Sequence, residues 1–225
     1  MKELPIPFSG SMVRALQREM NPKSQTRRVL VQATGPSLSV TDNGDGTAEL
    51  SWLHGDGPGH DVHETLKTVR CPYGQPGDRL YVRERWAAGA CADSLAPREL
   101  HPGTWLQDNG GLWFEADGAE PTHAISPRGK WRQGMFMPKW ASRIWLENVG
   151  VRVERVQDIS EVDAIAEGLT PAIVADQTLW ELPNGAKVAD PCRAYRALWD
   201  SLNAARGYGW DVNPYVWVVE FKRAS

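Results

Sequence analysis

Apolar residues recur at helical spacing in three stretches of the chain. The first stretch predicts a short helix from about Ser11 to Met20, which Asn21-Pro22 ends because proline cannot continue the backbone hydrogen bonds. The second is the run ISEVDAIAEGL, and the third extends from Pro191 to about Ala205. The expected N-caps of the three helices are Ser9 or Ser11, Ser160 and Asp190, and Gly168 is the expected end of the second helix. The apolar residues of each helix are expected to form its buried face. In chain order these faces are Met12, Val13 and Leu16; Val162, Ile165, Ala166 and Leu169; and Tyr195, Leu198, Trp199 and Leu202.

Alternation of apolar and polar residues predicts the strands. The segments SLSVT and AELSW flank DNGDGT and indicate a hairpin, and Arg79 to Trp86 alternates as one strand. The run ASRIWLENVGVRVERVQDI predicts two strands joined near Glu147 to Gly150, and NPYVWVVEFKR predicts a final strand. Five to seven strands and three helices without strict alternation favour an α+β fold, with a small β-barrel closed by the last strand.

Composition narrows the class of protein. The chain has 225 residues, which is long enough for a hydrophobic core. A formal net charge of −3 argues against a chain that is basic throughout and coats nucleic acid non-specifically. No apolar run is long enough for a transmembrane helix, and the first residues lack the apolar segment of a signal peptide. The three widely spaced cysteines favour a cytoplasmic protein with reduced thiols.

The six residues KSQTRR, from Lys23 to Arg28, are the first candidate site. Arginine forks bind phosphate or carboxylate groups, and a lysine partly desolvated beside arginines loses its proton more readily. On a strand, Thr26 and Arg28 share a face, and Lys23 on the preceding turn can approach them. The alternative is a solvated turn followed by an edge strand with exposed basic residues.

Two carboxylates interrupt the surrounding pattern. Glu84 lies among the apolar positions of the strand that ends at Trp86, so that it is either paired or functional, and Arg83 beside it is the other candidate for a pocket. Glu167 lies in the last turn of the helix that follows Ser160, where a negative charge is slightly unfavourable against the helix dipole. Solvent exposure is the alternative for Glu167.

Two loop-rich segments carry further polar clusters. In LHGDGPGHDVH the spacing of His54, His60 and His63 fits no zinc motif, so a solvated loop is expected and no metal site. In the second segment, basic residues around Trp131 suit contact with a nucleic-acid backbone and stacking on bases, or else are exposed loop charges. The basic residues are Arg128, Lys130, Arg132 and Lys139, with Trp140 nearby.

Several motifs in order resemble those of the ASCH-domain family, in the larger form carried by bacteriophages and prophages. The motifs are KSQTRR, GDRLYVRERW, PKWASRIWL, VERVQDISEVDAIAEG, LWDSLN and NPYVWVVEF. The resemblance covers about residues 5 to 34, 72 to 86 and 136 to 223. It implies a single PUA-like domain over residues 1–225, a small β-barrel with flanking helices, and insertions at about 35–70 and 87–135.

The resemblance also implies a function. Family members bind RNA or nucleotides in a cleft beside the barrel, and small bacterial relatives remove the acetyl group of N4-acetylcytidine with a lysine, a threonine and a glutamate. Aligned with this chain, these residues fall on Lys23, Thr26 and Glu167, whereas Ser24 stands where the motif usually has threonine. The other residues expected to bind substrate are Arg27, Arg28, Tyr81, Arg83, Glu84 and Trp86.

In the implied reaction, neutral Lys23 takes a proton from Thr26 or from water, and Glu167 passes it to the leaving amine. Arg28 or backbone amides hold the developing oxyanion, and Tyr81 or a tryptophan stacks on the base. No cofactor is expected, and the expected partner is a modified nucleoside or a single-stranded nucleic acid. The alternatives are a nucleic-acid-binding module without chemistry, a ribonuclease, for which the sequence offers no histidine pair, and a purely structural phage protein.

Overall fold

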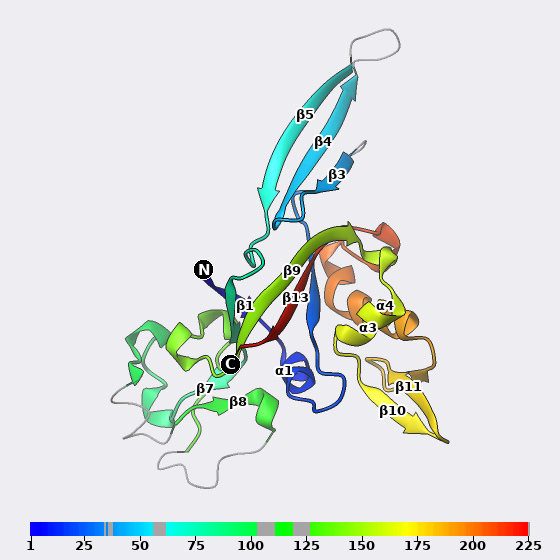
Figure 1. The fold of residues 1–225 in the computed structure, drawn as a ribbon. Coiled ribbons are helices and arrows are strands. Elements are labelled where there is room, and N and C mark those ends of the chain that lie inside the picture. Colours follow the sequence, from blue (N-terminus) through cyan, green and yellow to red (C-terminus); the bar gives the residue numbers. More distant parts are fainter. Residues whose placement is uncertain (34, 36–37, 56–61, 103–110, 119–126, 225) are drawn as a thin grey trace.

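The computed structural model describes residues 1–33, 35, 38–55, 62–102, 111–118 and 127–224 (Figure 1). It is a mixed α/β fold that consists mostly of strands in several sheets, with three helices in the described residues: α1 (Gly10–Leu16), α3 (Glu161–Ala166) and α4 (Pro191–Asn203). This agrees with the coarse fold class that the sequence predicts.

A five-stranded sheet forms the centre of the fold, with the order β1-β6-β9-β13-β2. Its strands β1 and β6 run parallel, and the other neighbours are antiparallel. The last of these strands in the chain, β13, therefore lies inside the sheet, and β1 and β2 are its two edges. The bounds are β1 (Glu3–Pro7), β2 (Gln25–Val29), β6 (Arg79–Arg83), β9 (Trp145–Arg155) and β13 (Tyr215–Arg223).

Three smaller sheets surround this centre. One comprises β3 (Leu38–Asp42), β4 (Thr47–Gly55) and β5 (Val62–Arg70), and it projects from the body as a long arm (Figure 1). The others are β7 (Trp86–Ala87) with β8 (Trp113–Phe114), and the meander β10 (Pro171–Val174), β11 (Gln177–Glu181) and β12 (Lys187–Val188). The predicted hairpin is confirmed as β3 and β4, whereas β5 and the β10 to β12 meander were not predicted.

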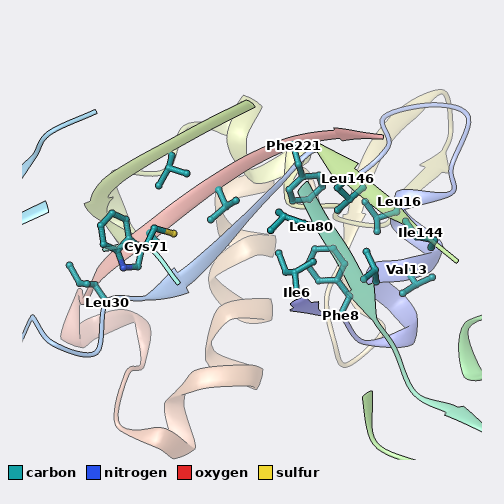
Figure 2. Close-up of a cluster of buried hydrophobic side chains, with 14 of the residues drawn as sticks. Ile6, Phe8, Val13, Leu16, Leu30, Cys71, Leu80, Ile144, Leu146 and Phe221 are labelled. Carbon is teal, nitrogen blue, oxygen red and sulfur yellow. The ribbon is translucent and has the colours of Figure 1, made fainter. Parts of the chain in front are cut away.

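Strand β13 is buried on both faces, which explains its nearly continuous apolar sequence. Trp217, Val219 and Phe221 pack into a cluster with α1 and β6 (Figure 2). Val216 and Val218 face the opposite side and pack against α3 and α4. The sheet thus separates two cores, and the helices α3 and α4 cover the face next to β2.

Three local predictions are wrong. Residues 145–155 form one strand instead of two, because Val149 is accommodated as a β-bulge where the register shifts opposite Glu220 and Phe221. Helix α1 ends at Leu16, before the predicted end at Met20. The expected strand from Arg79 to Trp86 breaks after Arg83, so that Trp86 begins β7.

Two residues expected in buried helix faces are exposed. Val162 is 76% exposed, because the two-turn helix α3 packs through Ala164 instead. Leu202 in the last turn of α4 is 47% exposed. The predicted caps are confirmed, since the side chains of Ser9, Ser160 and Asp190 accept hydrogen bonds from the first turns of the three helices.

Candidate functional site

The early end of α1 places Lys23. The chain folds back after the helix, and the backbone N–H of Lys23 donates a 3.0 Å hydrogen bond to the carbonyl oxygen of Ala15. The ammonium group is then directed inward, where it donates to the carbonyl oxygens of Gln25 (2.7 Å) and Glu167 (2.6 Å) and to Oε2 of Glu167 (3.0 Å). The side chain is completely buried. Burial lowers the pKa of Lys23, although the carboxylate of Glu167 opposes this effect.

Glu167 occupies the C-cap position of α3, directly before Gly168, whose φ of +90° ends the helix. Its Oε2 accepts from Lys23, and its Oε1 accepts a 3.2 Å hydrogen bond from Arg27. Two cations thus flank one buried carboxylate. The unfavourable position at the helix end is offset by these partners. Glu167 is buried, so the alternative of a solvent-exposed side chain is wrong.

Arg27 extends this cluster into a charged network. Its guanidinium also donates to Glu154 and Asp163, and it lies over the ring of Tyr195 at 5.8 Å. Arg152 donates to the same two carboxylates from the outer side. Because Nε and both terminal nitrogens of Arg27 donate to carboxylates, we assign Arg27 a positioning role toward Glu167.

Strand β2 is an edge of the central sheet, so its side away from β13 has no neighbouring strand in the described part of the sheet. Four consecutive residues, Thr26 to Val29, line a cavity of about 730 Å³ that Glu167 and Tyr195 also line. Within the described residues, the hydroxyl of Thr26 has no hydrogen-bond partner. The site therefore presents a carboxylate and a hydroxyl in one cavity. Lys23 lies behind Glu167 and lines a separate cavity of about 320 Å³.

The β-ladder also directs a backbone donor toward the free edge of β2. Leu30 N–H donates to Tyr215, and Phe221 N–H donates to Ser24, so that even-numbered residues of β2 face β13. In an antiparallel pair the residues between them point away. The N–H of Arg27 is therefore directed away from β13 and can serve a ligand of the cavity.

Arg28 and Arg83 line the cavity as expected, and they lie where the two edges of the sheet approach each other. Arg28 donates a 2.7 Å hydrogen bond to the carbonyl oxygen of Pro7 on the opposite edge strand. Its guanidinium lies over the rings of Phe8 and Tyr73, at 5.6 and 5.8 Å. The cavity is therefore situated at the seam between β1 and β2.

Three predicted substrate-binding residues are not brought to the cavity. Tyr81 is buried against Trp145, with ring centroids 5.7 Å apart. Glu84 is buried and accepts two hydrogen bonds from Arg143, so that it is paired and not directed at a ligand. Trp86 is fully buried in a separate apolar cluster and has no surface for stacking. None of the three is among the residues that line the cavity.

The sequence did not predict several of the residues that line the cavity. The sequence assigned Tyr195 to the apolar face of α4. Tyr195 also lines the cavity, and burial raises the pKa of its hydroxyl well above the ordinary value. Phe8 and Tyr73 are aromatic residues in segments that predict no site. The remaining unexpected polar residues of the wall are Ser9, Arg85, Glu115, Gln133, Asn203 and Arg206.

The basic residues around Trp131 have different roles. Arg128 and Arg85 lie over the Trp131 ring, at 4.5 and 5.7 Å, close to the cavity wall. Arg132 instead is buried and donates to the carbonyl oxygens of residues 92 and 95. Lys139 pairs with Glu3. Only part of the predicted basic set is thus available near the cavity.

The part of the chain that the structure describes contains no group of three or more His, Cys, Asp or Glu side chains that could hold a metal ion. The cluster of His54, His60 and His63 lies outside the described side chains. None of the described helices is long and apolar enough to span a membrane. Comparisons with protein-family models, with curated proteins and with solved structures found no match.

Proposed function

We propose that this protein hydrolyses the N-acyl group of a modified pyrimidine nucleoside or nucleotide, of the N4-acetylcytidine type. The observation that carries the proposal is the contact between Lys23 Nζ and Glu167 Oε2 at 3.0 Å, in which the lysine is completely buried. A lysine with this burial and a carboxylate that lines a cavity are the groups needed to move a proton during amide hydrolysis.

The geometry supports one route for the proton. Glu167 lines the cavity, and it accepts a proton from the attacking water as the water oxygen bonds to the acyl carbon. In the active form Lys23 has lost the proton that it donates to Oε2 in the structure, and the neutral amine accepts this new proton across the 3.0 Å hydrogen bond. The proton returns by the same route to the exocyclic nitrogen as the carbon–nitrogen bond breaks, which yields the free amine and the carboxylic acid.

Three other groups support this reaction. The hydroxyl of Thr26 is positioned to bind the water or the acyl oxygen, and the free-edge N–H of Arg27 can donate to the developing oxyanion. Arg27 keeps the carboxylate of Glu167 in place through its 3.2 Å hydrogen bond. Tyr73, in place of Tyr81 and Trp86, supplies an aromatic surface for a base, because it is only partly buried and lines the cavity.

We further propose that the central sheet is a PUA-like barrel of the ASCH type that is closed across a seam. Its two edge strands are joined by the hydrogen bond from Arg28 to Pro7 and not by a ladder. The resemblance of KSQTRR and VERVQDISEVDAIAEG to the family motifs supports this, because the structure joins these two motifs at Lys23 and Glu167.

A second candidate is a nucleic-acid-binding module without chemistry. It is favoured by the arginines of the cavity wall and by the stacking of Arg128 and Arg85 on Trp131. The two candidates differ in turnover, not in binding.

The test is chromatographic detection of product from N4-acetylcytidine, its deoxy form and its 5′-monophosphate, with purified wild-type protein and the Glu167→Gln variant. Product from the wild type and a loss of at least a hundredfold in the variant support hydrolysis. Equal rates for the two proteins contradict it. Absence of turnover together with salt-dependent binding of single-stranded RNA or DNA favours the second candidate.

A further inference from the structure

Three arginines of the cavity wall carry a buried hydrogen-bond donor without an acceptor. The Nε–H groups of Arg28, Arg83 and Arg85 are inaccessible to solvent and have no partner in the described part of the chain. Such unsatisfied donors are unfavourable in a folded protein, and they show that the surrounding protein does not fully satisfy these three guanidinium groups. A ligand oxygen would bind the terminal nitrogens and not the inaccessible Nε–H groups, and because the three arginines line one cavity they suit a common ligand that is rich in acceptors.

Aromatic rings and backbone carbonyls hold two of these guanidinium groups in place. Arg28 is fixed by its hydrogen bond to Pro7 and lies over the rings of Phe8 and Tyr73. Arg83, at the end of β6, donates to the carbonyl oxygen of Met135 at 3.1 Å. These contacts leave the charges of the two arginines without an acidic partner, and they orient the guanidinium groups before a ligand binds.

Arg85 is held differently. It donates a 2.6 Å hydrogen bond to Glu115 and lies over the ring of Trp131. Its Nε–H still lacks an acceptor, because the carboxylate binds the terminal nitrogen only. The ion pair therefore positions the guanidinium of Arg85 but leaves its Nε–H without a hydrogen bond.

The charge balance of the cavity points to an anion. Five arginines and two glutamates are among the residues that line it. Each glutamate is paired with one arginine, Glu167 with Arg27 and Glu115 with Arg85. Three cavity arginines thus have no acidic partner among the described side chains. These are Arg28, Arg83 and Arg206.

We propose that Arg28, Arg83 and Arg85 form a subsite for a phosphate ester. A phosphate group offers more acceptor oxygens than a carboxylate and suits several guanidinium forks at once. The substrate is then a nucleotide, or a nucleotide within a single strand, and not a free nucleoside. The inference rests on the proposed function for the base, whereas the phosphate subsite stands on the arginines alone.

The experiment measures binding by titration calorimetry at low salt, so that it does not depend on turnover. The probes are ribose 5-phosphate, cytidine, cytidine 5′-monophosphate and a short single-stranded oligocytidylate. Ribose 5-phosphate tests the subsite without a base, and cytidine tests the base without a phosphate. The monophosphate and the oligonucleotide distinguish a phosphate monoester from the diester of a strand.

The variants are Arg83→Gln and Arg85→Gln, with Arg79→Gln as the matched control. Arg79 lies on the same strand as Arg83 and stacks on Trp145 at 5.3 Å, but it does not line the cavity. We expect a phosphate-bearing probe to bind the wild type and Arg79→Gln equally, and each of the other variants at least tenfold more weakly. Melting curves establish that all variants are folded.

The outcomes separate the two proposals. If ribose 5-phosphate binds in this pattern and cytidine does not add to the affinity, the phosphate subsite is supported and the pyrimidine assignment fails. If cytidine and its monophosphate bind equally, or if Arg83→Gln and Arg85→Gln bind phosphate esters like the wild type, the subsite is wrong. Absence of binding by every phosphate-bearing probe also overturns it.

Discussion

The guanidinium of Arg28 donates a hydrogen bond to the carbonyl oxygen of Pro7 and thereby joins the two edge strands of the central sheet. Pro7 also pairs with Arg83 through the parallel ladder of β1 and β6. One short stretch of backbone thus connects two arginines of the cavity wall. The seam of the sheet and the proposed ligand site share the same residues.

Replacement of Arg28 tests how much the seam contributes to stability. We expect Arg28→Ala to lower the free energy of unfolding by about 1–2 kcal/mol, since one hydrogen bond and two ring contacts are lost. Arg79→Ala removes only a stacked arginine and should cost less than about 1 kcal/mol. Urea unfolding of both variants measures the difference, and equal losses would mean that the seam contributes nothing.

Glu167→Gln tests the proton route without a change in side-chain size. We expect turnover to fall by about 10²–10⁴-fold, the usual contribution of general acid–base catalysis. Glu154→Gln is the matched control, because Glu154 also binds Arg27 but does not line the cavity. The control should retain activity within about tenfold. Similar losses in the two variants would indicate damage to Arg27 instead of a role for Glu167 in catalysis.

The pH dependence of turnover reports on Lys23. Burial lowers the pKa of Lys23 below the ordinary lysine value, and the proton route requires the neutral amine. Below this pKa the lysine is protonated and the rate is low, so kcat/KM should rise with pH and level off once the pKa is passed. The residual activity of Lys23→Met should lack this rise. A wild-type profile that falls between pH 6 and 9 would contradict the assignment.

Gly168 is the position where backbone conformation and the site depend on each other most directly. A Cβ atom there would lie 2.9 Å from Cβ of Ala15 and 3.0 Å from Cβ of Lys23, at a φ of +90°. Gly168→Ala should therefore lower both stability and turnover. Gly185→Ala separates the two causes, since Gly185 has a φ of +81° and no atom within 4 Å of its Cβ position.

In both variants, an alanine in the left-handed backbone conformation should by itself lower the free energy of unfolding by about 1–2 kcal/mol. The excess loss in Gly168→Ala then measures the crowding against Lys23. Thermal or urea unfolding gives the stabilities, and the same preparations give the activities. Equal destabilisation with unchanged turnover would show that the close approach at Gly168 has no bearing on the site.

The cysteines should differ in reactivity. Burial raises the pKa of Cys71 to about 11, whereas Cys91 is exposed. At pH 8 a disulfide reagent should modify Cys91 rapidly, Cys192 more slowly and Cys71 only after unfolding, because the thiolate is the reacting form. Peptide mapping after a short exposure identifies the modified residue. Early modification of Cys71 would contradict the burial of this residue.

Local structure was predictable where one short segment determines it. Ser160 caps α3, and Gly168 ends it, because capping and left-handed φ depend only on neighbouring residues. The bulge at Val149 was not predictable in this way, since it depends on the register with Glu220 and Phe221 in a distant strand. Without knowledge of that distant strand, the sequence of Glu147 to Gly150 resembles a turn.

The candidate site shows the same division. Clustered charges in KSQTRR marked Lys23 and Arg27 as unusual, and the position of Glu167 against the helix dipole marked that residue separately. The association of Lys23 with Glu167, 144 positions away, came only from the family resemblance. The burial of Trp86 and the pairing of Glu84 with Arg143 were not predictable, because a strand pattern does not reveal that β6 ends at Arg83. Tyr195 was overlooked because an aromatic residue on a helix face is usually part of a core.

The central position of β13 affects how the site assembles during synthesis. Strand β2 has no ladder partner until residues 215–223 emerge from the ribosome and insert between β9 and β2. Until then Arg27 lies on an unpaired strand of the nascent chain, and Lys23 lies two residues before that strand. Pairing over such a sequence separation is slow compared with local folding. We therefore expect the contacts of Lys23 and Arg27 with Glu167 to be completed only after translation of β13.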